Sequence, residues 1–379
     1  MTTISSRAVL IDGEFRPATI RFEDGVIVEV ADHTSGDQDY GDLNVLPGLV
    51  DTHVHVNQPG RTDWEGFATA TAAALAGGST TIVDMPLNSI PPTISVAALE
   101  VKRASASGEI SCDVAFWGGI VPGSESEVKG LVAEGVCGFK VFLTDSGVPE
   151  FPPVDMATIT DLHLDVPLLV HAEWPALIGE SGSDYPSYLA SRPPEAEAEA
   201  IRRLSELGGP VHILHVSSGD GVDAIAAGPS SMTGETCPHY LTFVDADVTG
   251  TEFKCAPPIR NEEHRAALWE ALQMGTLGMV VSDHSPSPST LKEGDFASAW
   301  GGVASVQLRL PATWHGAATR DIGLESVTHW LSAAPAALAG LGRTKGSIEV
   351  GKDADFAVFD PDGATTVSAE TLLQRHPST

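Results

Sequence analysis

Two histidines separated by a single residue, His53 and His55, follow an apolar run that contains Leu49 and Val50. Such a run is typical of a buried strand, and a Pro-Gly step at positions 59–60 marks a break soon after it. Side chains alternate faces along a strand, so the two imidazoles point the same way and can bind one transition-metal ion. Two core histidines satisfied by backbone groups are the alternative, which is the more frequent one for an isolated His-x-His.

Four further polar residues stand where other apolar segments are expected to end, namely Lys140, His171, His215 and Asp283. Barrel enzymes carry their chemistry at the C-terminal ends of strands, so we expect these side chains to converge with the two histidines. Each one alone has an ordinary explanation, because a lone histidine is often a core residue and an aspartate often caps a helix. Together they provide four imidazoles, a carboxylate and an amine, which is the composition of a metal site.

Lys140 lies inside the apolar segment 137–142. A charged ammonium there would be desolvated, at a cost on the order of several kcal/mol. Desolvation lowers the pKa of a lysine, and a neutral amine can react with carbon dioxide to form a carbamate, an anionic oxygen ligand that can bridge two metal ions. The alternative is a lysine whose head group reaches solvent at the strand end, and the local sequence does not separate the two.

A regular alternation of elements positions these residues. After the opening strand near residue 50, strands are expected at 80–84, 113–117, 138–142, 167–170, 211–214, 232–236 and 279–282. Helical patterns precede several of them, and the clearest are at 65–76, 96–107, 125–133 and 327–341. The count of about eight βα units is the number that a closed (β/α)8 barrel of the TIM type needs. A doubly wound open sheet is the competing architecture, and periodicity does not exclude it.

The two ends of the chain have a different sequence pattern, which predicts short strands and turns. The Asp-Gly steps at 12–13 and 24–25 are hairpin signals. We therefore expect an α/β protein with a barrel at 47–343 and a small β-sandwich domain. Residues 1–46 and 344–379 are expected to form that domain together.

The composition of the chain limits the classes of molecule that it can bind. The 379 residues include 21 Lys and Arg against 51 Asp and Glu, and the formal net charge of -30 repels nucleic acid and anionic membrane surfaces. The four cysteines are scattered without a Cys-x-x-Cys pair, which predicts free thiols in a reducing compartment. The sequence shows no apolar leader segment and no run long enough to span a bilayer. We expect a cytoplasmic protein that binds a small molecule.

The motifs around the candidate residues resemble the cyclic amidohydrolases, the family of hydantoinases, dihydroorotases and allantoinases. The segments that carry this resemblance are 48–55, 138–140, 170–173, 215–218, 281–286 and 345–355. Within the family, the segments most similar to allantoinases are 57–66, 84–92, 254–260 and 299–302. The resemblance extends from the N-terminal strands to about Asp360.

The resemblance implies two divalent metal ions per chain, zinc first, with cobalt or manganese as alternatives. It assigns His53, His55 and Asp283 to one ion, His171 and His215 to the other, and a carboxylated Lys140 as the bridge. It also implies hydrolysis of a cyclic amide, namely allantoin to allantoate in purine breakdown, with Asp283 moving the proton between the attacking water and the leaving nitrogen. A homotetramer is implied as well.

Three residues are expected to contact the substrate, namely Asn57, Asn88 and Cys255. Asn57 stands where dihydroorotases carry an arginine for a substrate carboxylate, so the resemblance favours a neutral ring with amide edges. Cys255 has an alternative as a small buried apolar residue. His239 and His284 are expected to support the site rather than to bind substrate.

Two departures from the family affect this interpretation. The segments from Lys140 to His171 and from His171 to His215 are short beside those of allantoinases, which favours reduced loops and a shifted substrate preference. The segment 344–379 stops where family members continue, so the small domain is expected to be truncated or reduced. Hydantoinase, dihydropyrimidinase and dihydroorotase activities are the alternatives within the family. A catalytically inactive scaffold is the alternative from another class, but all six ligands that it would lack are present.

Overall fold

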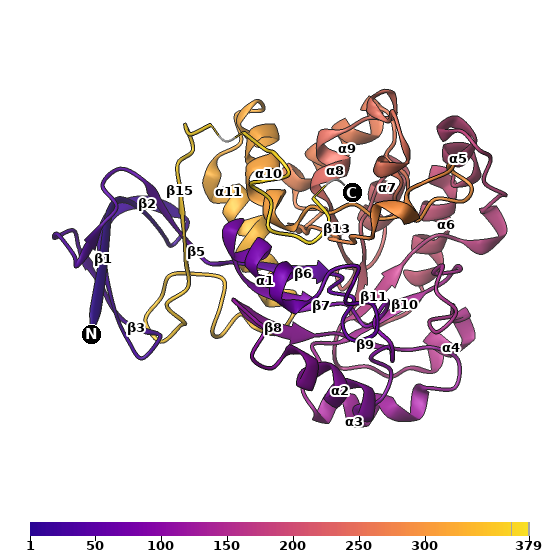
Figure 1. Ribbon diagram of the computed structural model, residues 1–379, viewed down its shortest axis with the longest axis horizontal. Helices are drawn as coiled ribbons and strands as arrows, with labels where there is room; N and C mark the ends of the chain where they lie inside the picture. Colours follow the sequence, from indigo (N-terminus) through magenta and orange to yellow (C-terminus); the bar gives the residue numbers. More distant parts are fainter. Residues whose placement is uncertain (365, 378–379) are drawn as a thin grey trace.

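The computed structural model describes residues 1–364 and 366–377 as an α/β protein with a small and a large part (Figure 1). The small part is one six-stranded mixed sheet with the order β15-β5-β1-β2-β3, in which β4 pairs with β1. Its strands are β1 (Thr2–Ile11), β2 (Glu14–Glu23), β3 (Val26–Asp32), β4 (Gln38–Asp39), β5 (Asn44–Pro47) and β15 (Phe356–Phe359). The two ends of the chain therefore meet in one sheet, because β15 pairs antiparallel with β5.

The hairpin turns of the small sheet follow from the Asp-Gly steps. Asp12 and Asp24 have φ angles of 52° and 51°, and the glycines after them have 81° and 79°. Positive φ at both central residues is the requirement of a tight hairpin turn. The strands are longer than expected, since β1 and β2 each run for ten residues. The first half of β1 is rich in Thr and Ser and lacks an apolar alternation, so its pairing with β2 was not visible in the sequence.

The large part contains two parallel sheets with the orders β6-β7-β8 and β14-β13-β12-β11-β10-β9. Every expected strand is present, and the bounds differ by at most two residues. The strands are β6 (Leu49–Val54), β7 (Ser79–Asp84), β8 (Asp113–Phe116), β9 (Gly118–Gly119), β10 (Phe139–Phe142), β11 (Leu168–His171), β12 (Val211–Ile213), β13 (Thr233–Thr236) and β14 (Met279–Val280).

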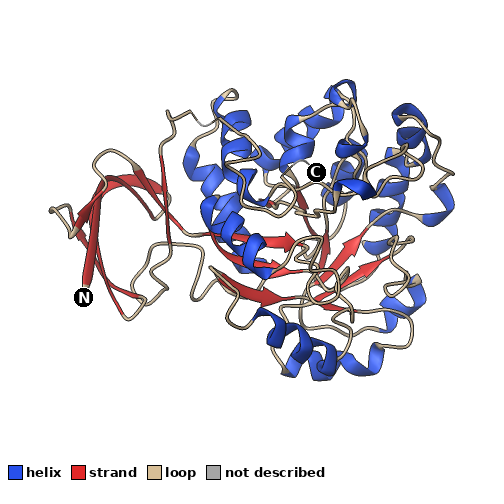
Figure 2. Ribbon diagram, viewed as in Figure 1, coloured by secondary structure: helices blue, strands red, loops and turns tan. Residues whose placement is uncertain are grey.

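Helices surround these strands (Figure 2). The α-helices are α1 (Phe67–Ala76), α2 (Val96–Ala106), α3 (Val128–Ala133), α4 (Met156–Asp161), α5 (Tyr185–Ser191), α6 (Pro194–Leu204), α7 (Gly219–Ala226), α8 (Pro238–Thr242), α9 (Glu262–Met274), α10 (Arg309–Ala318), α11 (Leu324–Thr328) and α12 (Ala334–Leu338). Short 3-10 turns lie at η1 (Glu125–Glu127), η2 (Pro175–Leu177), η3 (Asp245–Asp247), η4 (Thr251–Phe253), η5 (Ser289–Leu291) and η6 (Val306–Leu308), and η7 (His329–Ala333) is a π-helical turn. The helix expected at 327–341 is thus divided into α11, η7 and α12. None of the helices in the described ranges is long and apolar enough to cross a membrane.

The end of β6 lies next to the segment that follows β14. Val54 pairs with His284 in a parallel bridge, and the backbone N–H of His55 donates to the carbonyl of His284 at 2.8 Å. The backbone N–H of Ser282 donates to the carboxylate of Asp51 at 3.1 Å. These contacts bring the first and last strands of the large part together at their carboxyl ends, where the candidate residues lie.

Lys345 joins the two parts of the molecule. Its ammonium lies 2.6 Å from Asp355 Oδ2 and 2.9 Å from Asp353 Oδ2, and it also pairs with Asp113 at the start of β8. Burial opposes the charge, but these carboxylates outweigh it and raise the pKa of Lys345. One cation therefore neutralises acidic groups from both parts.

We expect Lys345→Ala to lower the free energy of unfolding by about 1–2 kcal/mol, because three carboxylates lose their common partner while solvent still screens them in part. Urea denaturation of the wild type and the variant measures this difference. Arg343→Ala, at an exposed neighbouring position, is the control. Equal stability of Lys345→Ala and the wild type would contradict the role of this ion-pair cluster.

Candidate metal centre

The structure brings all six predicted metal ligands to one place at the carboxyl ends of the strands. His53 lies in β6, Lys140 in β10 and His171 at the end of β11, whereas His55, His215 and Asp283 follow β6, β12 and β14 by one, two and three residues. Each is less than a tenth exposed. Residues separated by up to 230 positions therefore share one buried site.

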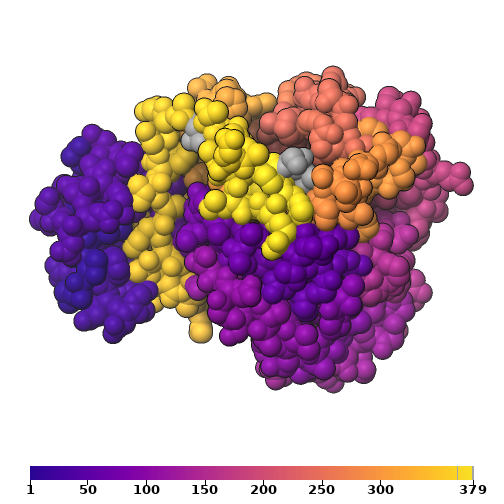
Figure 3. All heavy atoms as spheres, viewed as in Figure 1, coloured from indigo at the N-terminus to yellow at the C-terminus, as the bar shows by residue number. Residues whose placement is uncertain are grey.

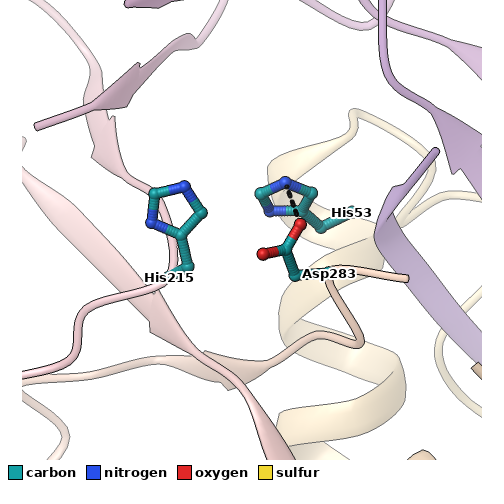
Figure 4. A group of neighbouring side chains, drawn as sticks. All are labelled: His53, His215 and Asp283. Carbon is teal, nitrogen blue, oxygen red and sulfur yellow. Dashed lines mark ion pairs between the residues drawn. The ribbon is translucent and has the colours of Figure 1, made fainter. Parts of the chain in front are cut away.

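The first group of ligand atoms lies around Asp283, and Figure 4 shows Asp283 and His53 of this group together with His215. Its Oδ1 atom is 3.0 Å from His53 Nε2 and 3.7 Å from His55 Nε2. The Nζ atom of Lys140 is 3.3 Å from His53 Nε2. Two imidazole nitrogens and one carboxylate oxygen thus face one another, with the lysine amine beside them.

The second group consists of His171 and His215. Nδ1 of His171 lies 3.0 Å from Nε2 of His215, and the ring centroids are 4.7 Å apart. The ring of His215 is 5.4 Å from that of His53, which places the second group directly beside the first. One ligand atom each of His53, His215 and Asp283 lies within 4.8 Å of the other two. The two groups therefore form one continuous cluster.

The hydrogen bonds on the outer side of the rings test whether this cluster fits a metal. Nδ1 of His53 is 2.6 Å from Glu235 Oε1, and Nε2 of His171 is 2.7 Å from Glu173 Oε2. A nitrogen that faces a carboxylate carries the proton, so Nδ1 of His171 presents its lone pair to the cluster. Nε2 of His53 faces the carboxylate of Asp283 at 3.0 Å, so a metal ion there would take the place of the proton between these two groups. Inward lone pairs and an ionised carboxylate are what a divalent transition metal binds. The residues fit the group.

Lys140 does not reach solvent, since only 1% of it is exposed. The alternative of a solvent-exposed head group is therefore wrong. Burial lowers the pKa of Lys140 to about 8, although Asp283 and Glu235 act in the opposite direction. With this pKa, about a tenth of the amine is neutral at pH 7, and the neutral amine is the form that reacts with carbon dioxide.

The backbone of the site is strained. Seven non-glycine residues in the described ranges have positive φ, and four of them are predicted site residues: Asn57 (66°), Asn88 (69°), His215 (39°) and Asp283 (45°). Such conformations cost about 1–3 kcal/mol each and persist where the surrounding structure holds them. The side-chain directions of these residues are therefore fixed by the fold rather than by local preference.

Two glutamates that support the histidines were not predicted from the sequence. Glu235 lies in β13 and contacts both His53 and His212, the latter at 3.1 Å. Burial disfavours its charge, but the two imidazoles outweigh burial and lower the pKa of Glu235 to about 2. Glu173, two residues after His171, is also fully buried and pairs with Arg192. Glu235 could have been noticed because it lies inside a strand that was expected to be buried. Glutamates are seldom buried without a partner, so its position there indicates an interaction.

Replacing Glu235 with glutamine is expected to weaken the affinity for one metal ion by about 10–100-fold, because the carboxylate that orients His53 is lost. Competition with a chromophoric chelator measures the affinity. Glu206→Gln, at an exposed position on the surface, is the matched control. Unchanged affinity in Glu235→Gln would contradict the orienting role.

A cavity of about 350 Å³ opens beside the cluster. Five of the predicted ligands line it together with Asn88 and Cys255. Asn57 is not one of the lining residues: it is buried, its Nδ2 donates to the carbonyl of Pro286 at 3.3 Å, and its Oδ1 has no hydrogen-bond partner among the described residues. His239 is also buried and outside the lining.

Both the sequence and the fold are similar to those of known proteins. The model of the amidohydrolase family matches residues 44–375. The chain is 46% identical to an allantoinase of Streptomyces avermitilis, over 98% of this chain and 88% of that protein, and 40% identical to an allantoinase of Saccharomyces cerevisiae, over 100% and 90%. An L-hydantoinase (dihydropyrimidinase) structure from Arthrobacter aurescens superposes with a TM-score of 0.93 at 29% identity, covering 100% of this chain and 91% of that one. The similarity thus includes both parts of the molecule.

Proposed function

The chain belongs to the amidohydrolase family, and from this premise we propose that it hydrolyses the hydantoin ring of allantoin to give allantoate. It is a hydrolase that acts on cyclic amides. The convergence of His53, His55, His171, His215, Lys140 and Asp283 in one buried cluster carries the proposal. The two allantoinases above, each matched over nearly the whole chain, support the choice of substrate. The reaction belongs to purine breakdown.

The proposed cofactor is a pair of divalent ions, with zinc as the first choice. His53, His55 and Asp283 would hold one ion, His171 and His215 the other, and a carboxylated Lys140 would bridge them. When bound, the two ions supply Lewis acidity, which lowers the pKa of a water molecule and polarises the scissile carbonyl. The inward lone pair of His171, the carboxylate of Glu235 behind His53 and the neutral fraction of Lys140 support this assignment.

Asp283 is the proposed proton carrier of the reaction. Three imidazoles hold it ionised, because His53, His215 and His55 outweigh burial and keep the pKa of Asp283 well below its usual range. An ionised carboxylate can accept the proton of the attacking water as its oxygen bonds to the amide carbon. Asp283 then returns that proton to the ring nitrogen as the carbon–nitrogen bond breaks, which leaves a carboxylic acid and a free ureido nitrogen. The acid releases its remaining proton to solvent and becomes the carboxylate.

Substrate contacts are proposed for Asn88, Cys255 and Asn57. Asn88 and Cys255 line the cavity. The amide nitrogen of Asn88 is 3.4 Å from His55 Nδ1, and Arg61 donates to the carbonyl of Asn88 at 2.7 Å, so this loop is held close to the metal ligands. For Asn57, the atom without a partner, Oδ1, is the proposed contact, and its position outside the cavity lining makes it the weakest of the three.

The proposal includes the architecture that presents the site. We propose that the two parallel sheets form one closed (β/α)8 barrel at 47–343, supported by the bridge between Val54 and His284 and by the continuation of β8 into β9. We propose that the small sheet, formed from 1–46 and 344–379, folds over itself as a β-sandwich around an apolar cluster that includes Ile20, Val45 and Ile348. A homotetramer and a cytoplasmic location remain predictions.

An assay with four substrates tests the function. Metal-loaded protein is incubated with allantoin, hydantoin, dihydrouracil and dihydroorotate, and ring opening is followed for each. We expect the highest kcat/KM with allantoin. Highest activity with hydantoin or dihydrouracil would instead assign the protein as a hydantoinase or dihydropyrimidinase. Activity only with dihydroorotate would contradict the inference that Asn57 favours a neutral ring. Inactivity toward all four with two ions bound would favour a scaffold.

A further inference from the structure

The C-terminal segment returns to the large part and lies beside the residues that precede α1. We define residues 368–376 as the C-terminal strap. In Figure 3 its yellow atoms lie against the violet atoms of the first third of the chain. Gln307 donates to the carbonyl of Thr371 at 2.9 Å and accepts from the N–H of Leu373 at 2.8 Å, and the imidazole of His376 contacts the carbonyl of Asp63 at 2.7 Å. The strap is thus fixed at several points.

Glu65 is the residue that the strap reaches in the interior. Its side chain is completely buried, and no Lys or Arg pairs with it among the residues for which ion pairs are described. Its Oε1 accepts the backbone N–H of Arg375 at 3.1 Å, and the hydroxyl of Thr69 donates to the same oxygen. The guanidinium of Arg375 donates to the backbone carbonyl of Glu65. The other oxygen of Glu65 lies 3.2 Å from His284 Nε2.

The contacts of His284 define its protonation. The backbone N–H of Ser305 donates to His284 Nδ1 at 3.1 Å, so that nitrogen carries the lone pair and Nε2 carries the proton. Nε2–H then donates to Glu65. A buried imidazole with both nitrogens engaged has one orientation, and the loss of either partner leaves a buried polar group unsatisfied.

His284 in turn touches the candidate metal centre through its backbone. It follows Asp283 directly, and its carbonyl accepts the N–H of His55 at 2.8 Å. Asp283 has a φ of 45°, a conformation that the surrounding structure must hold. The orientation of His284 therefore affects the positions of two proposed ligands, the carboxylate of Asp283 and the imidazole of His55.

We propose that Glu65 is a positioning residue for the metal centre, and that the strap completes its support through the N–H of Arg375. Glu65 fixes His284, and His284 fixes the backbone that presents Asp283 and His55. This inference rests on the ligand assignment of the proposed function, but it concerns the affinity for metal and does not depend on the choice of substrate.

The first test is Glu65→Gln. The two oxygens of Glu65 accept from three donors, namely the Thr69 hydroxyl, Arg375 N–H and His284 Nε2–H. A glutamine has one acceptor oxygen, so its amide nitrogen would face a donor at the other position. We expect the affinity for one of the two metal ions to fall about tenfold, measured by chelator competition with zinc alone. We also expect kcat for allantoin to fall by a similar factor while KM stays within twofold. Glu14→Gln, at an exposed position of β2, is the control.

The second test separates the backbone donor from the side chain of the strap. Arg375→Pro removes the N–H that Glu65 accepts, whereas Arg375→Ala keeps it. We expect Arg375→Pro to weaken metal binding about as much as Glu65→Gln, and Arg375→Ala to weaken it less than threefold. The double variant Glu65→Gln/Arg375→Pro should bind metal no more weakly than the single variant with the lower affinity. Both changes break the same connection, which runs from the strap through Glu65 to His284.

Three results would overturn the inference: unchanged metal affinity in Glu65→Gln, equal losses in Arg375→Ala and Arg375→Pro, or additive losses in the double variant. If Glu65→Gln does not fold, which its thermal melting curve reports, the two variants of Arg375 decide the question. Weakened metal binding in these variants, together with a wild type that hydrolyses no cyclic amide, would retain this inference and reject the proposed function.

Discussion

Replacing Lys140 with alanine is expected to reduce allantoin hydrolysis by about three orders of magnitude or more, a change of about 4 kcal/mol in transition-state stabilisation. The side chain is buried beside His53 and Asp283 and is the proposed bridge between two ions. Without it, the site loses an anionic ligand and the second ion is expected to bind weakly. Steady-state kinetics and metal analysis of the same preparation measure both effects. Lys129→Ala, at an exposed position of α3, is the matched control.

Short carboxylic acids provide a second readout of the Lys140 prediction. Acetate or propionate can occupy the space left by Lys140→Ala and should restore part of the activity and the metal content, because they supply the missing oxygen ligand. In the wild type, the pKa of about 8 means that the neutral amine increases as the pH rises toward 8. Metal-stripped protein should therefore recover activity faster at pH 8 than at pH 6 when zinc and dissolved carbon dioxide are held constant. Full activity of Lys140→Ala without added acid would exclude the bridging role.

Replacing Asp283 with asparagine is expected to lower kcat by about 10²–10⁴-fold. The amide oxygen can still lie near His53 and His55, but asparagine cannot accept the proton of the attacking water. KM should change less than kcat, because the substrate contacts proposed for Asn88 and Cys255 are retained. Stopped-time assays of ring opening across a range of allantoin concentrations give both constants.

Asp223→Asn, at an exposed position of α7, controls for the change of charge. Retention of at least a tenth of the wild-type kcat in Asp283→Asn, with two ions bound, would transfer proton movement to another residue. His239, buried and with both ring nitrogens lacking a partner among the described residues, would be the first to examine.

The cluster of candidate ligands could be predicted because the ends of apolar strands are easy to locate in the sequence. Apolar segments of four to six residues were visible, and four of them contain or are closely followed by Lys140, His171, His215 or Asp283. Parallel strands place their carboxyl ends on one face, so a list of strand ends became a list of neighbours. The strand expected at 232–236 is present as β13 and contributes Glu235.

The supporting contacts could not be predicted, since they depend on pairs that no local pattern connects. Glu235 meets His53 across 182 positions, and Arg375 meets Glu65 across 310. The positive φ angles of His215 and Asp283 are likewise imposed by tertiary structure, because neither local sequence contains a glycine-type turn signal. The last residues of the chain also reach this region, because Arg375 contacts Glu65, and Glu65 contacts His284, the residue after Asp283.

The pairing of β15 with β5 has a consequence for biosynthesis. Phe356 lies opposite Pro47 and Phe359 opposite Asn44, so β5 leaves the ribosome some 300 residues before its neighbour exists. During that interval the outer side of β5 is a bare edge, which can recruit an identical strand from another nascent chain. Chains whose translation stalls before residue 356 should therefore be prone to aggregation. Transient binding of a chaperone at that stage would protect the nascent chain.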